Sequence, residues 1–442
     1  MNSESGKGLG RTLIYGCLPG LLLVTCSAFA ADSWRTVANF TAEERALYDP
    51  ATSTPRDTTI PYIPAEPYPF EAPYTAEEMG FRQAEFVHIS RWDYLMVDAF
   101  GVVTSSGYIN QGASVGYIDN PGQTGLMGYI TGTKPGEVYG KWAMYDVFPP
   151  ESENTQQLWF PARTDIENRS KMDFFVYSPS LRRVRRQPEP RRDQRFPDNS
   201  QTFDDVLGRD PWELAWEVIG SDTLYETMRF PSTRQTIVLN IDGQGFVEKP
   251  TSSIKMMGDD CPYYRADGGL DAWVLKATTK PEWLPDYNEK YYVLWLEKNT
   301  FFPLRIEKYG KDGRLMMVEE RLGDKSNPAL GDFGYASFSS MYWNVDHDLI
   351  GYSFHDGHTL REWTDEEVEM IFSAEFMRRE WLIEPIKSQV LIRDPAEWFL
   401  RPHLYPERFP GHRNMTLSPE IDARYRAQEA AGRVVFESGG DH

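Results

Sequence analysis

The chain of 442 residues carries 46 basic and 66 acidic side chains, a net charge of −20, together with 13 Trp, 24 Tyr and 24 Phe. This charge argues against nucleic acid or an anionic membrane surface as the main partner, because both repel such a chain at long range. The length is ample for a buried core. The aromatic content suits either a large half-buried sheet or the wall of an apolar ligand cavity, and both interpretations stay open.

Residues 1–30 are predicted to form a cleavable signal peptide. Lys7 and Arg11 precede a mostly apolar run over residues 12–29, and the small-x-small pattern of Ala28-Phe29-Ala30 predicts cleavage after Ala30. A retained membrane anchor and a lipid-modified cysteine are the alternatives. We therefore expect export to an oxidising compartment such as a bacterial periplasm.

Cleavage would remove Glu4, Lys7 and Arg11 and change the net charge from −20 to −21. Two of the three cysteines lie inside the predicted signal, which leaves Cys261 alone in the mature chain. A single cysteine forms no internal disulfide, so the fold is expected to depend on burial.

Residues 31–80 are predicted to be a Pro-rich N-terminal arm with short helices. Thr41-Ala-Glu-Glu44 and Thr75-Ala-Glu-Glu78 are capping boxes, each of which opens a short helix. Between them, seven prolines remove backbone donors and exclude regular helix, so this arm is expected to lie along the surface of another element.

From residue 81 to about 410, short β-branched and aromatic runs separated by Gly, Pro, Asn and Asp predict a meandering antiparallel sheet. Tyr291 to Glu319 is the clearest hairpin, with Gly310-Lys-Asp-Gly313 as its turn. About a dozen strands favour a mainly β (α+β) fold with a large curved sheet or open barrel. The predicted strands are 84–91, 94–103, 126–131, 138–147, 158–163, 174–178, 224–230, 236–240, 272–278, 291–297, 304–309 and 314–319.

Two helices are predicted near the end of the chain. Thr364-Asp-Glu-Glu367 caps the first, near 365–380, whose apolar side is expected to pack on or plug the sheet. Ser418-Pro419 begins the second, within a helical tail at 411–442.

Two sequence features could indicate catalysis or metal binding, but neither matches a complete motif. Gly112-Ala-Ser114-Val-Gly116 matches the G-x-S-x-G pattern of a hydrolase, but a turn rather than a helix follows, so we interpret it as a Gly-rich loop. An ester hydrolase that uses Ser114 with His347, His355 or His358 is kept as the rival hypothesis. The same histidines and neighbouring aspartates match no specific metal motif, and we expect no metal and no cofactor.

An arginine-rich segment stands out in this acidic chain. It supports two interpretations: internal pairing with Asp204, Asp205, Asp210, Glu213 and Glu217, or docking on a protein partner or a lipid headgroup. Its seven arginines are Arg182, Arg183, Arg185, Arg186, Arg191, Arg192 and Arg195.

The run Phe175-Val-Tyr-Ser-Pro-Ser-Leu-Arg-Arg-Val-Arg-Arg186, followed by Thr202-Phe-Asp-Asp205, resembles exported proteins of the outer-membrane lipoprotein-sorting superfamily, related in fold to the LolA and LolB carriers. The strand pair that begins at Tyr292-Val-Leu-Trp-Leu-Glu297 resembles the same superfamily. Within it, the segments Met79-Gly-Phe-Arg-Gln-Ala-Glu85 and His88-Ile-Ser-Arg91 are similar to a domain-of-unknown-function family of periplasmic proteins.

This resemblance implies an unclosed LolA/LolB-like barrel whose covering helices enclose an apolar cavity. It also implies an association with inner-membrane transporters of the resistance-nodulation-division (RND) type and with the outer membrane. We therefore expect a non-enzymatic periplasmic protein that binds and transfers a lipid or other hydrophobic molecule. A protein-binding scaffold is a further alternative. The predicted cavity residues are Phe100, Trp142, Trp159, Phe175, Trp216, Trp295 and Phe372.

Overall fold

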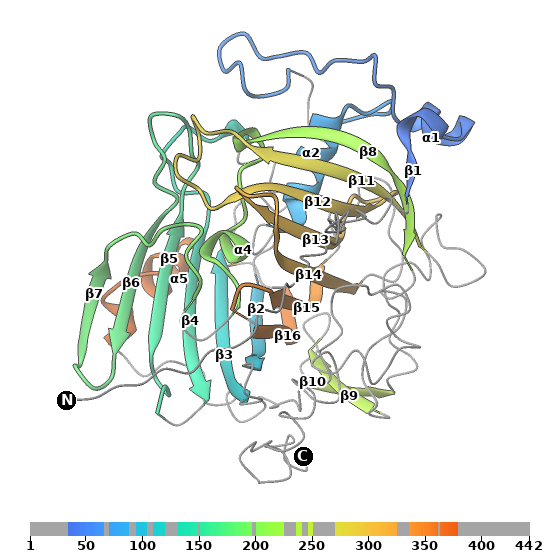
Figure 1. Cartoon of the computed structure of the whole chain (residues 1–442). Helices are drawn as coiled ribbons and strands as arrows, with labels where there is room; N and C mark the ends of the chain where they lie inside the picture. Colours follow the sequence, from blue (N-terminus) through green and yellow to red (C-terminus); the bar gives the residue numbers. More distant parts are fainter. Residues whose placement is uncertain are drawn as a thin grey trace, which may run out of the picture. The chain divides into compact units, whose positions relative to one another are not determined.

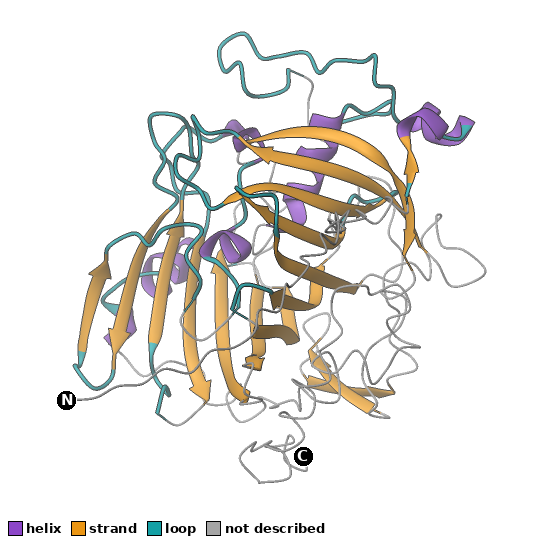
Figure 2. Cartoon of the chain, viewed as in Figure 1, coloured by secondary structure: helices purple, strands orange, loops and turns teal. Residues whose placement is uncertain are grey.

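Figures 1 and 2 show the computed structural model, in which strands make up most of the regular structure. It describes residues 34–65, 70–87, 94–103, 109–119, 131–148, 151–196, 200–224, 236–240, 246–250, 270–324, 336–347, 349–360 and 363–378. The predicted signal peptide, most of the predicted strands 126–131 and 224–230, and the predicted tail at 411–442 lie outside these residues.

One 16-stranded sheet dominates the described residues, in the order β1-β8-β11-β12-β13-β14-β15-β16-β2-β3-β4-β5-β6-β7 with β9 and β10 off this path. Neighbouring strands along the path are antiparallel, and β1 and β7 are its two ends. In Figure 1 the strand direction turns markedly between the group β8, β11, β12 and β13 and the group β3–β7. The prediction of a mainly β, strongly curved and unclosed antiparallel sheet is thus confirmed.

The strands have the following bounds: β1 Arg35–Thr36, β2 Tyr94–Val103, β3 Ile109–Asp119, β4 Lys141–Phe148, β5 Gln156–Pro161, β6 Met172–Ser178, β7 Arg183–Gln187, β8 Leu214–Leu224, β9 Thr236–Asn240, β10 Phe246–Pro250, β11 Leu270–Thr279, β12 Glu289–Glu297, β13 Pro303–Gly310, β14 Leu315–Asp324, β15 Ala336–Asn344 and β16 Leu349–Leu360.

Helices are short and begin at the capping residues seen in the sequence. Thr41, Thr75 and Thr364 each accept a hydrogen bond from the backbone N–H three residues later, and the glutamate there accepts one in return. No helix among the described residues is long and apolar enough to cross a membrane. The helices are η1 Val37–Asn39, α1 Ala42–Leu47, α2 Ala76–Val87, α4 Phe203–Leu207, η2 Pro211–Glu213, α5 Asp365–Ile371 and η5 Phe376–Arg378.

The sheet buries apolar side chains on both faces, because successive residues of a strand point to opposite sides. On β12, Leu294 and Leu296 pack with α2 and the N-terminal arm, whereas Val293 and Trp295 pack in a separate cluster. We call the side that contacts α2 the interior face. The register carries this face from Ile306 across the central strands to β3 and β4, where Trp142 packs with α4.

Helix α5 covers the opposite face from α2 and α4. Its Ile371 and Phe372 pack on Tyr117, Ala143 and Leu158 of β3–β5. A helix near 365–380 thus packs on the sheet as predicted, but on the face away from α2.

Two local predictions are wrong, and β16 was not predicted. Residues 84–87, predicted as part of a strand, belong to α2, because the capping box at Thr75 starts a helix that continues to Val87. The segment Gly112–Gly116 is not a loop but the middle of β3, paired on both sides with β2 and β4. The His- and Asp-containing segment after residue 348 forms β16.

Candidate functional site

Helix α4 carries two adjacent carboxylates into the space between the interior face and α2. Thr202 Oγ1 accepts a hydrogen bond from the N–H of Asp205 (3.3 Å), and the Asp205 carboxylate accepts one from the N–H of Thr202 (2.8 Å). Phe203 and Leu207 anchor the helix among apolar side chains of the interior face. Asp204 and Asp205 are therefore almost fully buried, at 1% and 4% exposure.

Asp204 is held by an arginine and a tyrosine. Arg192 donates from Nε to Asp204 (2.8 Å) and from its two terminal nitrogens to both oxygens of Glu213 (2.6 and 2.7 Å). The Tyr287 hydroxyl donates to the second Asp204 oxygen at 2.6 Å. This bidentate geometry ties α4 to η2 through charge-assisted hydrogen bonds.

Asp205 connects α4 to the strands of the interior face. Arg209 donates to Asp205 (3.2 Å) and to Glu289 (2.6 Å), which also accepts from the Tyr292 hydroxyl (2.5 Å). Lys308 of β13 forms a buried ion pair with Asp205. Buried charged side chains thus join helix α4 to β12 and β13.

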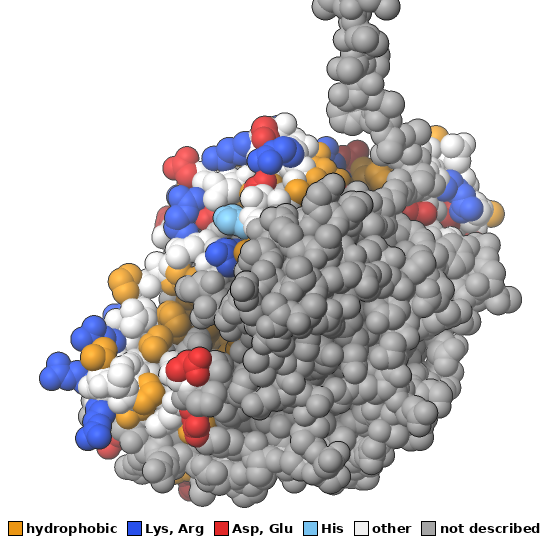
Figure 3. Space-filling view, turned by 60° about the horizontal axis from the view of Figure 1, so that its bottom comes forward, with side chains coloured by type: hydrophobic (Ala, Val, Ile, Leu, Met, Phe, Trp, Pro, Cys, Tyr) orange, Lys and Arg blue, Asp and Glu red, His pale blue; other side chains and the backbone are white. Residues whose placement is uncertain are grey.

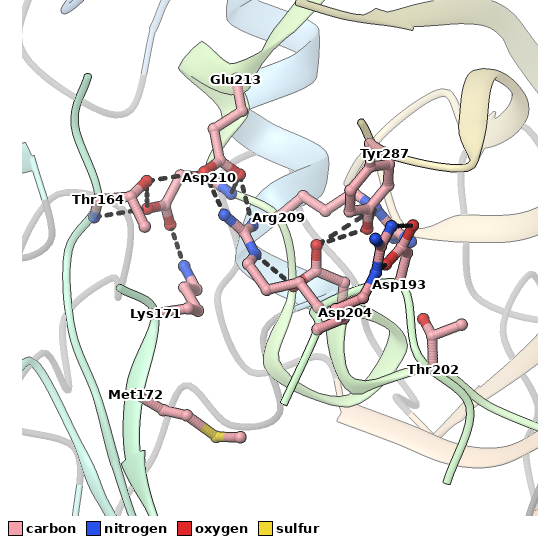
Figure 4. A network of polar contacts seen from close by, with 12 residues as sticks. Thr164, Lys171, Met172, Asp193, Thr202, Asp204, Arg209, Asp210, Glu213 and Tyr287 are labelled. Carbon is pink, nitrogen blue, oxygen red and sulfur yellow. Dashed lines mark hydrogen bonds and ion pairs between the residues drawn. The ribbon is translucent and has the colours of Figure 1, made fainter. Parts of the chain in front are cut away.

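Three further ion pairs extend this network. Lys308 also lies 3.1 Å from Glu319 of β14, which pairs with Arg321. On the other side, Asp210 accepts from Lys171 Nζ (2.5 Å) and from the Thr164 hydroxyl (2.6 Å), as Figure 4 shows. We call the set the interior ion network: Lys171, Arg192, Arg209, Lys308 and Arg321 with Asp204, Asp205, Asp210, Glu213, Glu289 and Glu319.

Two carboxyls of the network differ in their pKa values. Burial raises the pKa of Asp205, but Lys308 and Arg209 outweigh this effect and hold it below its usual range. Burial also raises the pKa of Glu289, and there Arg209 does not compensate fully, so the pKa stays above its ordinary value. Protonation of Glu289 would leave five cations facing five carboxylates.

A small cavity lies between the network and the apolar part of the interior face. Its volume is about 30 Å³, enough for one or two water molecules. Charged network members form one wall, and side chains of β8 and β11–β13 form an apolar wall. The lining residues are Gln83, Asp204, Asp205, Arg209, Leu214, Trp216, Ala277, Tyr292, Leu294, Ile306, Glu319 and Arg321.

Helix α2 contributes Gln83 to the cavity lining and lies very close to the sheet. A Cβ at Gly80 would overlap the indole ring of Trp216, so glycine is needed for this approach. The helix therefore rests directly on one of the aromatic wall residues of the cavity.

The seven predicted cavity aromatics lie on both faces of the sheet. Trp216 lines the cavity itself. Phe100, Trp142 and Trp159 share the interior face with it, at other positions. The other three, Phe175, Trp295 and Phe372, pack on the opposite face, so they do not line this cavity.

The seven predicted docking arginines also divide into groups. The prediction of Arg192 as a docking residue is wrong. Its side chain is 10% exposed and pairs with Asp204 and Glu213, which is the internal pairing that the sequence offered as an alternative. At the surface, Arg186 pairs with Asp173, and Arg191 with Asp193. Arg195 donates to the carbonyl of Phe196 and is half-buried.

Arg182, Arg183 and Arg185 lie on the β6–β7 hairpin. All three side chains are exposed and form no ion pair with another described residue. Leu181 beside them is 52% exposed. In Figure 3, Lys and Arg side chains lie next to hydrophobic ones at this left-hand margin of the sheet.

Ser114 lies in the middle of β3, fully buried, rather than at a strand-to-helix turn. His347 is hydrogen-bonded to Asn344, and the side chains of His355 and His358 lie outside the described set. Within the described ranges, no group of three or more His, Cys, Asp or Glu side chains could hold a metal ion.

The sequence prediction missed the role of Gln83, Arg209, Lys308 and Glu319. Lys308 and Glu319 belong to predicted strands, and only the ion pairs of Lys308 with Asp205 of α4 and with Glu319 reveal their role. Asp204 and Asp205 were named from the sequence, as possible partners of the arginine-rich segment.

No protein-family model matches the chain, and no curated protein matches it by sequence. Among solved structures, a domain assigned to outer membrane lipoprotein sorting from Vibrio parahaemolyticus is similar, with a TM-score of 0.46 and 12% identity, over 69% of this chain and 98% of that one. A DUF1329 family protein from Desulfovibrio piger has a TM-score of 0.46 and 15% identity, over 68% and 97% of the two chains.

A LolA superfamily protein from Nitrosomonas europaea is also similar, with a TM-score of 0.39 and 12% identity, over 69% of this chain and 99% of that one.

Proposed function

We propose that the chain is an exported, non-enzymatic binding protein that holds a hydrophobic or amphiphilic molecule against the interior face of its sheet and transfers it between membranes. The observation that carries the proposal is the cavity between α2, α4 and the strands, which has an apolar wall and a charged wall. Such a mixture is typical of sites that bury a largely apolar ligand and orient it by a few polar groups.

The cavity, of about 30 Å³, is smaller than any such ligand, so the proposal requires the site to widen. Uptake of a larger ligand requires α2 to move away from Trp216. Each methylene that enters contributes about 0.8 kcal/mol by leaving water, so a chain of several carbons offsets the loss of helix contacts. While α2 moves, the interior ion network holds α4 and the charged wall in place.

Native mass spectrometry of the purified protein, followed by organic extraction, tests this function. A hydrophobic molecule bound at one equivalent is the expected result. Protein that is reproducibly empty and also takes up no fluorescent lipid would contradict the proposal and favour the scaffold alternative.

A pair of variants tests the location of the site. Ala277 and Ala272 are both fully buried on β11, but Ala277 lines the cavity whereas Ala272 packs on the opposite face. Ala277→Val fills the cavity, so we expect it to reduce ligand uptake. Ala272→Val is the matched control, because overpacking costs about 1–3 kcal/mol of stability at either position. Equal uptake by both variants would place the ligand elsewhere.

We also propose that the β6–β7 hairpin docks the carrier on anionic lipid headgroups during transfer. Its support is the cluster Arg182, Arg183 and Arg185, unpaired among the described residues, beside the exposed Leu181. The net charge of −20 does not prevent this contact, because charges beyond about 8 Å are screened at physiological salt. We further propose that the molecule passes from an RND-type transporter to the outer membrane. The support for this step is the resemblance of the sequence motifs to the periplasmic family described above.

Sedimentation with vesicles that contain phosphatidylglycerol tests the docking. Arg183→Ala/Arg185→Ala should abolish salt-sensitive binding. Arg191→Ala/Arg314→Ala removes the same charge at ion-paired positions and should leave binding intact. A similar loss in both double variants would show that only net charge matters.

A further inference from the structure

Among the described residues that line the cavity, Gln83 has a polar atom whose hydrogen-bonding capacity is unused. Gln83 of α2 is 3% exposed and lines the cavity. Its amide nitrogen donates to the Gly80 carbonyl at 3.2 Å, whereas Oε1 has no hydrogen-bond partner among the described residues. A buried acceptor without a donor costs free energy, and a ligand that donates a hydrogen bond to it would remove this cost.

The charged groups of the same wall are committed to one another. Asp204 is paired with Arg192, Asp205 with Lys308 and Arg209, and Glu319 with Lys308 and Arg321. A carboxylate or phosphate head would meet paired carboxylates, and an ammonium head would meet paired cations. Among the described residues of this wall, each carboxylate already has a cation within ion-pair distance, so a charged head would have to displace an existing partner and leave that partner buried without a counter-charge, which is strongly unfavourable.

We propose that the ligand is an uncharged amphiphile whose head carries an O–H donor, which it gives to Gln83 Oε1. This inference rests on the proposed function and specifies its ligand class: a long-chain or polycyclic alcohol, rather than a fatty acid or a phospholipid. The apolar body lies along Leu214, Trp216, Leu294 and Ile306, the apolar wall of the cavity. Gln83 is thus the residue that selects the head.

Displacement of the neutral fluorescent probe N-phenyl-1-naphthylamine from the full protein tests the ligand class without any substitution. The competitors are 1-decanol, decyl methyl ether, which lacks the donor, decanoate and decylammonium. We expect decanol to bind about tenfold more tightly than the ether, because a single neutral hydrogen bond is at stake, and the two ions to bind most weakly.

Gln83→Leu then tests the residue. It removes the acceptor and keeps a good helix former, so decanol should lose about tenfold in affinity and fall to the level of the ether, which itself should not weaken. Gln156→Leu is the matched control, since Gln156 is also buried (1% exposed) with an unpartnered Oε1 among the described residues but lies on β5, outside the cavity. This variant should keep the preference for decanol.

The outcomes separate the two proposals. Equal affinity of decanol and the ether, or tightest binding of either ion, would overturn the inference on the head while leaving the carrier function supported. Loss of the preference in both glutamine variants would overturn the assignment to Gln83. No displacement by any of the four compounds, with no uptake of the probe, would overturn the carrier function itself.

Discussion

A buried carboxylate, Glu44, links the N-terminal arm to the sheet in addition to the strand pairing of β1 with β8, and its removal tests this link. Glu44 is 3% exposed and accepts hydrogen bonds from Lys298 Nζ (2.7 Å), the Ser221 hydroxyl (2.6 Å) and the N–H of Thr41 (2.7 Å). Burial alone would raise its pKa, but these donors outweigh burial and lower the pKa from 4.5 to about 2. The ionised carboxylate therefore stabilises the folded state.

The contribution of the ionised Glu44 to the free energy of unfolding follows from this pKa shift. A pKa lowered from 4.5 to about 2 corresponds to about 3 kcal/mol of stability, at about 1.4 kcal/mol per pKa unit. Because the folded-state pKa is depressed, this contribution is fully present above pH 4.5 and is lost as the pH falls from 4.5 towards 2. Glu44→Gln should lose about 3 kcal/mol at pH 7, in the range for breaking a buried pair, since Lys298 is left buried without its counter-charge.

Urea unfolding followed by far-UV circular dichroism, repeated at pH values from 7 to 2.5, measures both effects. The variant should be less stable at pH 7 and should show a correspondingly smaller loss of stability below pH 4.5. Glu43→Gln is the control, because Glu43 occupies the same first turn of α1 but is exposed. Parallel pH profiles for Glu44→Gln and the unaltered protein would refute the reasoning.

Three further substitutions test other parts of the structure. Thr202→Ala removes the cap of α4 and should lower the unfolding free energy by about 1 kcal/mol in urea titrations; an unchanged midpoint would contradict the capping role. Gly80→Ala forces a methyl group into the Trp216 ring and should cost about 1–3 kcal/mol and alter the near-UV spectrum, which an undisturbed α2 contact would leave unchanged. Lys171→Met leaves Asp210 buried without its cation and should cost about 3–5 kcal/mol in guanidinium unfolding, with partial recovery in Lys171→Met/Asp210→Asn.

Local features of this chain follow from short stretches of sequence. The threonine and glutamate of each capping box are three residues apart, so the helix starts at Thr41, Thr75 and Thr364 needed no distant contact to be predicted. The β13–β14 turn was equally local, because Gly313 adopts a φ of +77°, which glycine accepts without strain. The count of β-branched and aromatic runs predicted the class of fold for the same reason.

The faces of the sheet could not be predicted in this way. Alternation along β12 separates Leu294 from Trp295, but both sides of this sheet are buried, so hydrophobicity does not say which side contacts α2. Phe175, Trp295 and Phe372 are as apolar as Trp216 and lie on the side away from the cavity.

The sequence offered internal pairing of the arginine-rich segment as one interpretation, but it did not show which arginine is buried or that residues of distant strands take part in the interior ion network. Arg192 and Arg185 are arginines of one segment, yet Arg192 is buried against Asp204 and Glu213 whereas Arg185 is exposed on β7. Lys308 lies 103 residues from its partner Asp205. Capping and turn formation involve neighbours along the chain, which the sequence displays directly, whereas the burial of a charge depends on which distant segments the fold brings together around it.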